Sequence, residues 1–280
     1  MKKGKTFKAL ISLVLILALV MATTATAFAA SVKINKTKAT VYVGSSVTLK
    51  ISNTSSKVTW SSSNKEIATV KSTGSKTAKV TAVKPGKATI TAKVNGQKYK
   101  CVVTVKYKKG SRQNPAVATD GVTITTSQGK VSYTAKNILV GKDAEDLFKA
   151  ISPDWWRFHT EYESDKLEGN KIVALEYDVE VLSGYDEYGF SGYDLISSYE
   201  IYNEECNAAV EGVESWMFDS TKEYMYRSDL ELFEGGTATV YEFLVMPEDL
   251  TAFSTYDYDK NYNKYWIKYD LPQPELPQTE

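Results

Sequence analysis

The sequence contains very little of the chemistry that enzymes use for proton transfer. Among 280 residues there is one histidine, His159, and there are two cysteines, Cys101 and Cys206. A serine or cysteine nucleophile needs a neighbouring base, and the first half of the chain has no histidine to supply one. No recognisable nucleophile motif surrounds Cys206. The sequence therefore favours a protein with no catalytic residues and no cofactor.

The scarcity of cysteine excludes a scaffold held together by disulfide bonds. Cys101 and Cys206 fall in different halves of the chain, so cross-links within a half are ruled out. Cys101 shares its expected strand face with Val103 and Val105, which indicates a buried thiol that packs as a small hydrophobic group. We expect both thiols to be unpaired, and a bridge between the halves or between molecules is the alternative.

Long apolar runs are absent beyond the first thirty residues. Basic residues open the chain, an apolar run extends from Ala9 to Ala22, and an A-x-A pattern ends at Ala29. The pattern predicts a secretory signal peptide over 1–29, because the run is shorter than the roughly 20 residues of a membrane-spanning helix. The mature protein is then expected outside the cell, secreted or at the cell surface, with no membrane span.

Acidic residues are almost missing from the first half. Between Ser31 and Arg112 there are 18 basic residues against the single acid Glu66, a net charge of +17, whereas residues 116–280 carry 12 basic and 33 acidic residues, a net charge of −21. Arginine is nearly absent from the basic half and no basic and aromatic residues interleave, which argues against nucleic acid. The lysines form either a solvated face that protects edge strands or an attachment to a cell-wall polyanion.

Apolar residues alternate with polar ones throughout residues 31–107. The alternation recurs in short runs such as "SVTLKI", "KATITAKV" and "KCVVTV", and turn residues including Asn95-Gly96 separate the runs. Alternation with period two indicates half-buried strands, and Asn-Gly is a strong hairpin signal. These runs predict an antiparallel immunoglobulin-like sandwich.

Three blocks in this half carry a family resemblance. "VYVGSSVTLKI", "VTWSSSNKEIATV" and "VKPGKATITAKV" resemble successive blocks of the bacterial immunoglobulin-like group 2 domain over residues 34–105. The resemblance implies a spacer or adhesin module of surface and secreted proteins, without enzymatic activity. We expect Trp60 to fill the core, and Ser61, Ser62 and Ser63 to form a turn and not a nucleophile site.

Residues 108–121 read as a linker, and residues 122–271 as a second domain that is acidic and rich in tyrosine. "KIVALEYDVEVL" places valine, leucine and tyrosine on one strand face and acids on the other. A helix is expected over 142–151, with Pro153 just beyond it. Further strands are expected in "VTITTS", "KVSYTAKNILV", "DLISSYEIYN", "TATVYEFLVMP", "FSTYDYD" and "KYWIKYDL".

The second domain has a resemblance of its own. "LELFEGGTATVYEFLVMPEDL", residues 230–250, is similar to the late block of a telokin-like, immunoglobulin-like family of secreted bacterial proteins, and "IVALEYDVEVL" is similar to an earlier strand of that family. The resemblance implies a second sandwich. The predicted fold is mainly β, with two antiparallel immunoglobulin-like sandwiches in tandem, the second with a short helix, and a Pro-rich tail over 272–280. The closing "LPQTE" is similar to the sorting signal L-P-x-T-G, but coincidence is the favoured interpretation.

One segment is a candidate ligand site. "GYDEYGFSGYDL", residues 184–195, places Tyr185, Tyr188, Phe190 and Tyr193 among glycines and acids. Exposed rings beside carboxylates suit the binding of sugars or protein partners. The alternative is a loop that folds these rings onto its own domain.

Two further patterns are interpreted as structural. "DYDKNYN", residues 257–263, has the oxygens of a calcium loop but lacks its glycine and its final glutamate, so it predicts a polar hairpin turn and no metal site. His159 is expected on a strand surface or packed against Trp155 or Trp156.

The sequence thus predicts a non-catalytic secreted or cell-surface protein that serves as an adhesion, ligand-binding or spacer module. Its expected partner is a cell-wall polyanion or glycan, or another surface protein. The alternative is an extracellular hydrolase of wall or dietary polysaccharide with an immunoglobulin-like accessory domain, in which two acids lie at glycosidase spacing.

Overall fold

A computed structural model describes residues 30–162, 164–186, 189–191, 195, 201–211, 213–219, 224, 226 and 229–273. The expected signal peptide and the "LPQTE" end lie outside these ranges. Contacts divide the chain into two units, Met1–Lys106 and Tyr107–Glu280. None of the helices in the described ranges has both the length and the apolar character needed to cross a membrane.

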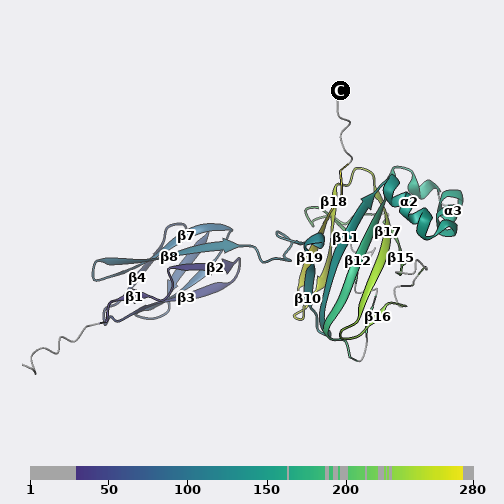
Figure 1. The fold of residues 1–280 in the computed structure, drawn as a ribbon. Helices are drawn as coiled ribbons and strands as arrows, with labels where there is room; N and C mark the ends of the chain where they lie inside the picture. Colours follow the sequence, from purple (N-terminus) through teal and green to yellow (C-terminus); the bar gives the residue numbers. More distant parts are fainter. Residues whose placement is uncertain are drawn as a thin grey trace, which may run out of the picture. The chain divides into compact units, whose positions relative to one another are not determined.

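The first unit is a sandwich of two four-stranded sheets (Figure 1). One sheet has the order β1-β3-β6-β5, and the other has the order β2-β8-β7-β4. All pairs are antiparallel except β2 with β8, which is parallel. The strands are β1 (Lys33–Ile34), β2 (Lys38–Tyr42), β3 (Ser46–Ser52), β4 (Thr59–Ser62), β5 (Ala68–Ser72), β6 (Thr77–Ala82), β7 (Gly86–Val94) and β8 (Gln97–Lys106).

Alternate residues of these strands form the core between the two sheets. Leu49 of β3, Ile90 of β7 and Val103 of β8 are completely buried, while their sequence neighbours face solvent. Asn95 and Gly96 join β7 to β8 with positive φ angles of 49° and 79°, as a two-residue hairpin requires. The expected strand runs are confirmed.

The segment around Trp60 is a strand followed by a turn. Val58 is 2% exposed, and Trp60, in β4, packs against the core while remaining half-buried. Ser61 and Ser62 complete β4, so the turn expected over Ser61, Ser62 and Ser63 begins only at Ser63. The Ser62 hydroxyl donates to the Asn64 carbonyl at 3.0 Å, and the Thr89 amide donates to the Ser63 hydroxyl at 2.9 Å. These serines hold the turn in place.

The second unit is also built from packed sheets, with a longer strand set (Figure 1). A five-stranded sheet has the order β10-β11-β12-β17-β15, a four-stranded sheet has the order β14-β18-β19-β9, and β13 pairs with β16. The strands are β9 (Ala116–Val117), β10 (Val122–Thr125), β11 (Gly129–Val140), β12 (Asn170–Gly184), β13 (Phe190–Ser191), β14 (Tyr202–Asn203), β15 (Glu214–Phe218), β16 (Glu231–Leu232), β17 (Thr237–Pro247), β18 (Ala252–Tyr258) and β19 (Lys264–Asp270).

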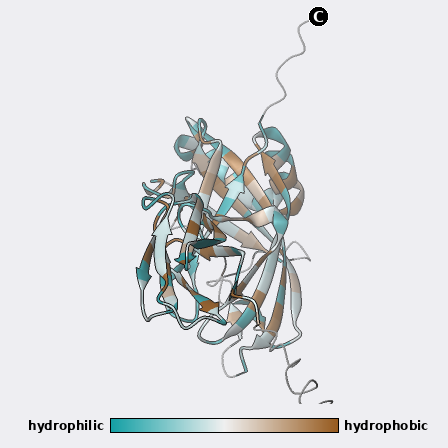
Figure 2. Cartoon of the chain, turned by 90° about the vertical axis from the view of Figure 1, so that its left-hand side faces the viewer, coloured by the Kyte–Doolittle hydropathy of each residue, from teal (hydrophilic) through white to brown (hydrophobic). Residues whose placement is uncertain are grey.

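Strand β12 shows how its sequence pattern sets the layers. Val173, Tyr177 and Val181 are buried in the core that the two large sheets share, whereas Asp178 and Glu180 face outward. Figure 2 shows hydrophobic and hydrophilic stretches alternating along the strands. The predicted half-buried strand is confirmed.

Helices cover one end of the five-stranded sheet (Figure 1). Helix α2 (Lys142–Ile151) has the predicted bounds and buries Ala144, Phe148 and Ile151 against β12 and β17. The sequence predicted this helix alone, but α3 (Pro153–Tyr162) and α4 (Ser164–Leu167) follow it. The mainly β fold with sandwich sheets is confirmed, with more helix than expected.

Part of the stretch expected to be a linker contributes to the second unit. Ala116 and Val117 of β9 pair in parallel with Ile267 and Lys268 of β19. The 3-10 helix η1 (Ala118–Asp120) follows directly, and both Ala116 and Ala118 are completely buried. These small side chains allow the backbone to pass close to the core.

Candidate functional site

The four aromatic residues expected to form a ligand site do not form an exposed group in the described part of the chain. Tyr185 is 2% exposed and Phe190 is completely buried, and their rings contact edge to face at 5.6 Å. The Tyr185 hydroxyl forms a 3.0 Å hydrogen bond with that of Thr126. These two rings therefore pack into their own unit, while Tyr188 and Tyr193 lie outside the described residues.

His159 lies in helix α3 and not on a strand surface. It is 4% exposed, and its ring lies 5.8 Å from that of Trp155 and 4.1 Å from that of Trp216, measured between centroids. The expectation that it packs against Trp155 is confirmed. The imidazole of His159 is therefore packed among aromatic rings.

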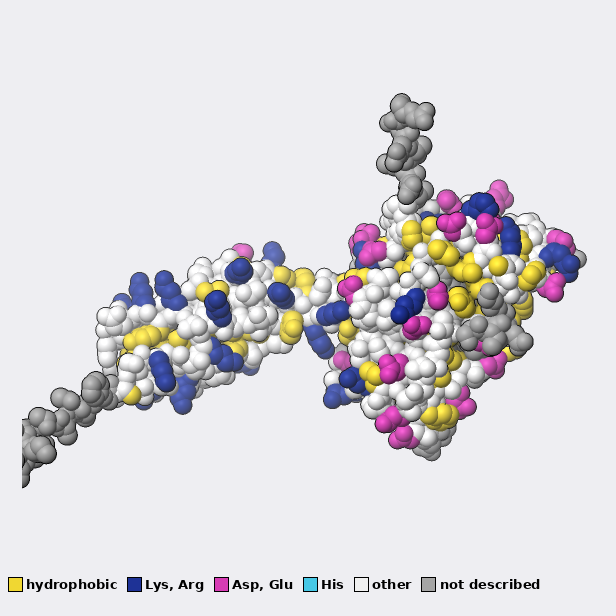
Figure 3. Space-filling model, in the orientation of Figure 1, with side chains coloured by type: hydrophobic (Ala, Val, Ile, Leu, Met, Phe, Trp, Pro, Cys, Tyr) yellow, Lys and Arg dark blue, Asp and Glu magenta, His cyan; other side chains and the backbone are white. Residues whose placement is uncertain are grey.

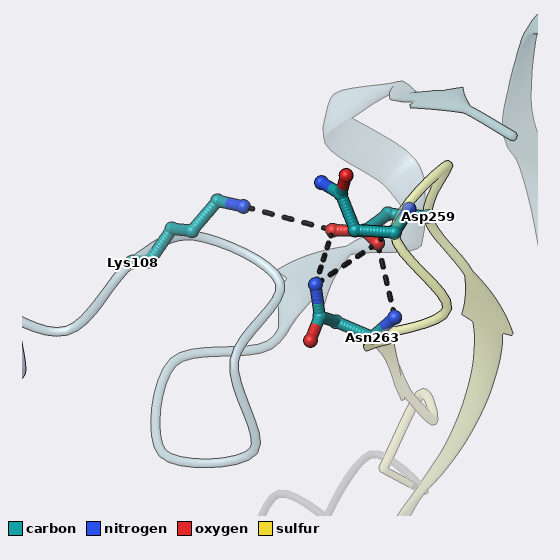
Figure 4. Close-up of polar contacts among 4 residues, drawn as sticks. Lys108, Asp259 and Asn263 are labelled. Atoms are coloured by element: carbon teal, nitrogen blue, oxygen red, sulfur yellow. Dashed lines mark hydrogen bonds and ion pairs between the residues drawn. The ribbon is translucent and has the colours of Figure 1, made fainter.

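The segment that resembles a calcium loop is the turn between β18 and β19. The Asp259 carboxylate accepts hydrogen bonds from the amides of Asn261 at 2.9 Å and Asn263 at 3.0 Å, and the side-chain amide of Asn263 also donates to it (Figure 4). The Lys108 ammonium lies 4.0 Å from the same carboxylate. Although burial opposes ionisation, the bonds from Asn263 and Asn261 hold the pKa of Asp259 below its usual value. The segment therefore forms the predicted polar hairpin turn.

The most concentrated charge lies on the first unit. Residues 31–106 contain fifteen lysines and one acid, Glu66; fourteen of these lysines are exposed and Lys76 is half-buried. Figure 3 shows lysine side chains distributed over the visible side of this unit. None of the fifteen forms an ion pair among the described residues of the unit, so their charges face solvent.

Six of these lysines project from the outer face of one sheet, which we call the lysine face. Inner residues alternate with outer ones along each strand, which identifies the outer residues of the β2-β8-β7-β4 sheet. None of these outer residues is an acid. Lys93 and Lys98 are direct partners across β7 and β8. The face comprises Lys38, Lys87, Lys93, Lys98, Lys100 and Lys106.

A shallow hollow of about 370 Å³ lies on the lysine face. Lys38 and Lys87 line it together with the side chains of Thr40, Val102 and Thr104. Its lining combines two ammonium groups with two hydroxyl donors, which is suited to an anionic group.

The opposite sheet is less basic. Its outer face carries Lys33, Lys50, Lys71 and Lys79, with Lys71 opposite Lys79 across β5 and β6. The sequence showed the excess of lysine but not its division between the faces, which depends on which residues of each strand point inward. The alternation in "GKATITAKV" and "QKYKCVVTVK" is the signal from which the division follows once the sheet order is known.

The first unit is assigned by its sequence and its fold together. Residues 28–105 match the family described as the bacterial Ig-like domain, group 2. The first unit is therefore a bacterial Ig-like domain of that group. No curated protein matches the chain.

Several solved structures resemble the chain. Domains 5–6 of the S-layer protein SbsC are 16% identical, with a TM-score of 0.27, over 87% of this chain and 98% of that one. The I9–I11 tandem of titin is 11% identical, with a TM-score of 0.26, over 86% of this chain and 66% of that one. SbsC domains 4 and 5 are 26% identical, with a TM-score of 0.25, over 27% of this chain and 44% of that one. The chain thus spans less than half of that last fragment.

Proposed function

We propose that this protein is a non-catalytic module of the cell surface or its surroundings, and that the lysine face of its first unit binds an anionic polymer of the cell wall. In this account residues 1–29 are a cleaved signal peptide. Residues 31–107 are the first domain, and the second domain, expected over 122–271, begins within the stretch expected as a linker, because β9 and η1 already belong to it. The lysine face is the observation that carries the proposal.

The arrangement of charge supports this function over a merely solvated surface. Like charges directly opposite each other on neighbouring strands destabilise a sheet, and each sheet has one such pair, Lys93 with Lys98 and Lys71 with Lys79. The lysine face adds four more lysines and a hollow lined by two of them, whereas the opposite face adds only two. Lysines commonly protect edge strands, and Lys98 and Lys100 lie on a part of β8 that β2 does not pair. Lys93, however, is paired on both sides, with Thr59 of β4 and Lys98 of β8. Protection of an edge therefore does not account for Lys93, whereas a polyanion would neutralise its repulsion with Lys98.

A sedimentation assay on purified cell walls tests the proposal. The mature protein is mixed with walls, and with walls from which the anionic polymer has been extracted chemically, at increasing salt. We expect retention on intact walls at low salt, loss of retention as salt screens the charges, and little retention on extracted walls. Equal retention on both preparations, or retention that is independent of salt, would show that another interaction holds the protein.

A further inference from the structure

The hairpin between β18 and β19, in the second unit, has a chemistry unlike that of the lysine face. Tyr258 and Tyr262 are 45% and 75% exposed, and the side chain of Lys264 is also exposed. We propose that this hairpin binds an oligosaccharide whose sugars carry carboxylates. Tyr258 stacks on a sugar ring and the Lys264 ammonium meets the negative charge. This site is independent of the polymer-binding function of the first unit.

Aromatic rings hold the Lys264 ammonium in place. Its nitrogen lies 3.6 Å from the ring centre of Tyr256, 5.6 Å from that of Trp266 and 5.8 Å from that of Tyr202. Trp266 contacts both tyrosine rings edge to face, at 5.1 and 5.0 Å. Because ring faces are negative, they attract the cation without neutralising it.

Lys264 therefore offers its charge to a ligand, unlike several lysines of the same unit. Ion pairs with carboxylates engage Lys136, Lys142, Lys149, Lys166 and Lys268. Lys264 forms none with the residues that the structure describes. In a unit rich in acids, this ammonium is complementary to a carboxylate that comes from outside.

Tyr258 supplies the second point of contact. It lies directly opposite Lys264 in the register of β18 and β19. Residues paired in this way have Cβ atoms roughly 4.5–5.5 Å apart, so a ring and an ammonium lie within the width of one sugar. Tyr256 supports the Tyr258 ring through an edge contact at 5.5 Å. The positive C–H groups of a sugar face favour the negative face of such a ring.

The hairpin is preorganised for binding. The bonds to Asp259 fix the turn, and the Lys260 amide donates to the Thr125 carbonyl at 2.7 Å, which ties the turn to the end of β10. Tyr262 occupies the left-handed region, with φ 59°, and its amide donates to the Asp259 carbonyl at 2.8 Å. A site that is already ordered loses less entropy when a ligand binds.

The size of the site favours a sugar over a protein partner. Two exposed rings and one ammonium offer far less surface than the roughly 800 Å² per partner of a stable protein interface. An acidic oligosaccharide needs only a ring to stack on and a cation, and the hairpin supplies both.

The test uses the mature full-length chain and three probes: tetragalacturonate, a hyaluronan tetrasaccharide and α2,8-linked trisialic acid. The chain carries the substitutions K93Q, K98Q and K100Q, so that the lysine face contributes little. Each probe is titrated while the indole N–H resonance of Trp266 is followed by NMR, with W266F assigning the signal. We expect at least one probe to shift this resonance in a saturable way.

Variants of the hairpin assign the two roles. K264Q should weaken binding of the responding acid about tenfold, the size expected for loss of a hydrogen bond to a charged group, and should leave its neutral methyl ester unaffected. Y258A should weaken both forms, and K260Q, the matched control in the same turn, should weaken neither. Thermal melting confirms that each variant is folded.

Three results would overturn the proposal. The first is that no probe shifts the Trp266 resonance. The second is that K260Q weakens binding of the acid as much as K264Q does. The third is that Y258A, while folded, binds as the parent does. None of these depends on whether the lysine face binds a wall polymer.

Discussion

At the scale of single residues, burial controls the reactivity of the two cysteines. Cys101 is completely buried and Cys206 is 2% exposed, and both thiols are free. Burial raises the pKa of each thiol above its ordinary value. Since the thiolate is the nucleophilic form, both cysteines should be unreactive in the folded protein.

Thiol labelling tests this expectation. At neutral pH, a thiol reagent should modify neither cysteine of the folded protein and both cysteines after denaturation. Because the pKa is raised, native labelling should increase only at a pH above the ordinary thiol value. C206S separates the contribution of Cys101. Rapid native labelling of either thiol would contradict the placement of that side chain.

The carboxylate of Asp259 should stabilise the hairpin turn. D259A removes the acceptor for the amides of Asn261 and Asn263, and loss of such bonds costs about 1 kcal/mol of unfolding free energy. Urea denaturation measures this cost, and hydrogen exchange at the Asn263 amide localises it. K260A, which leaves the acceptor in place, is the control. Unchanged protection at Asn263 in D259A would show that the carboxylate does not hold the turn.

The same residue predicts a dependence on pH. The pKa of Asp259 is lowered in the folded chain, so its contribution is present above the ordinary carboxyl value of about 3.9 and is lost as the pH falls through the lower folded value. The Asn263 amide resonance should therefore stay constant down to about pH 4 and shift only in more acidic solution. A transition near neutral pH would assign the shift to another group.

Single residues also show why the sequence could not decide between two interpretations of residues 184–195. Tyr185 and Phe190 were candidates for exposed ligand contacts, with a loop that folds its rings onto its own domain as the alternative, and the structure buries both rings as in the alternative. Gly184 explains this: a Cβ atom there would lie 2.4 Å from the Gln128 carbonyl oxygen, so glycine allows the backbones to approach and Tyr185 to turn inward. Local composition does not reveal such an approach between distant segments.

At the scale of elements, period-two alternation predicted strands correctly, whereas the structure of a segment rich in aromatic residues was not predicted. The face of β12 and the bounds of α2 followed directly from alternation and from the helical stripe. Helix α3, "PDWWRFHTEY", was missed because its aromatic residues favour strands, although Pro153 suits a first helical turn. Trp155 and Trp156 pack against the buried side chains of α2, β12, β15 and β17, and this packing overrides that preference.

Phe148 should account for much of the docking of α2. Its ring is completely buried, stacks on Phe243 at 4.4 Å and meets Trp156 edge to face at 5.8 Å. F148A should lower the unfolding free energy by about 3–5 kcal/mol, the usual cost of deleting a buried phenylalanine ring. K142A, on the exposed side of the same helix, is the control. A cost below about 1 kcal/mol for F148A would show that the helix packs loosely.

At the scale of the whole molecule, charge divides the chain by unit. Residues 31–106 carry fifteen basic residues and one acid, and residues 107–280 carry 15 basic residues and 33 acids. The sequence revealed this division between the units. Within the first unit, the sandwich distributes the lysines unequally, with six on the lysine face and four on the outer face of the opposite sheet. A bacterial Ig-like domain with no acid on either outer sheet face is suited to attraction by a polyanion.

The most direct test of the lysine face compares two triple variants of the mature protein. K93Q/K98Q/K100Q alters the lysine face, and K33Q/K50Q/K79Q makes the same charge change on the opposite sheet. Binding to purified wall anionic polymer is measured over a range of salt concentrations, and the slope of log affinity against log salt counts the charges engaged. The account predicts that the lysine-face variant loses on the order of two units of slope and the opposite variant loses little. Equal losses in the two variants would contradict it.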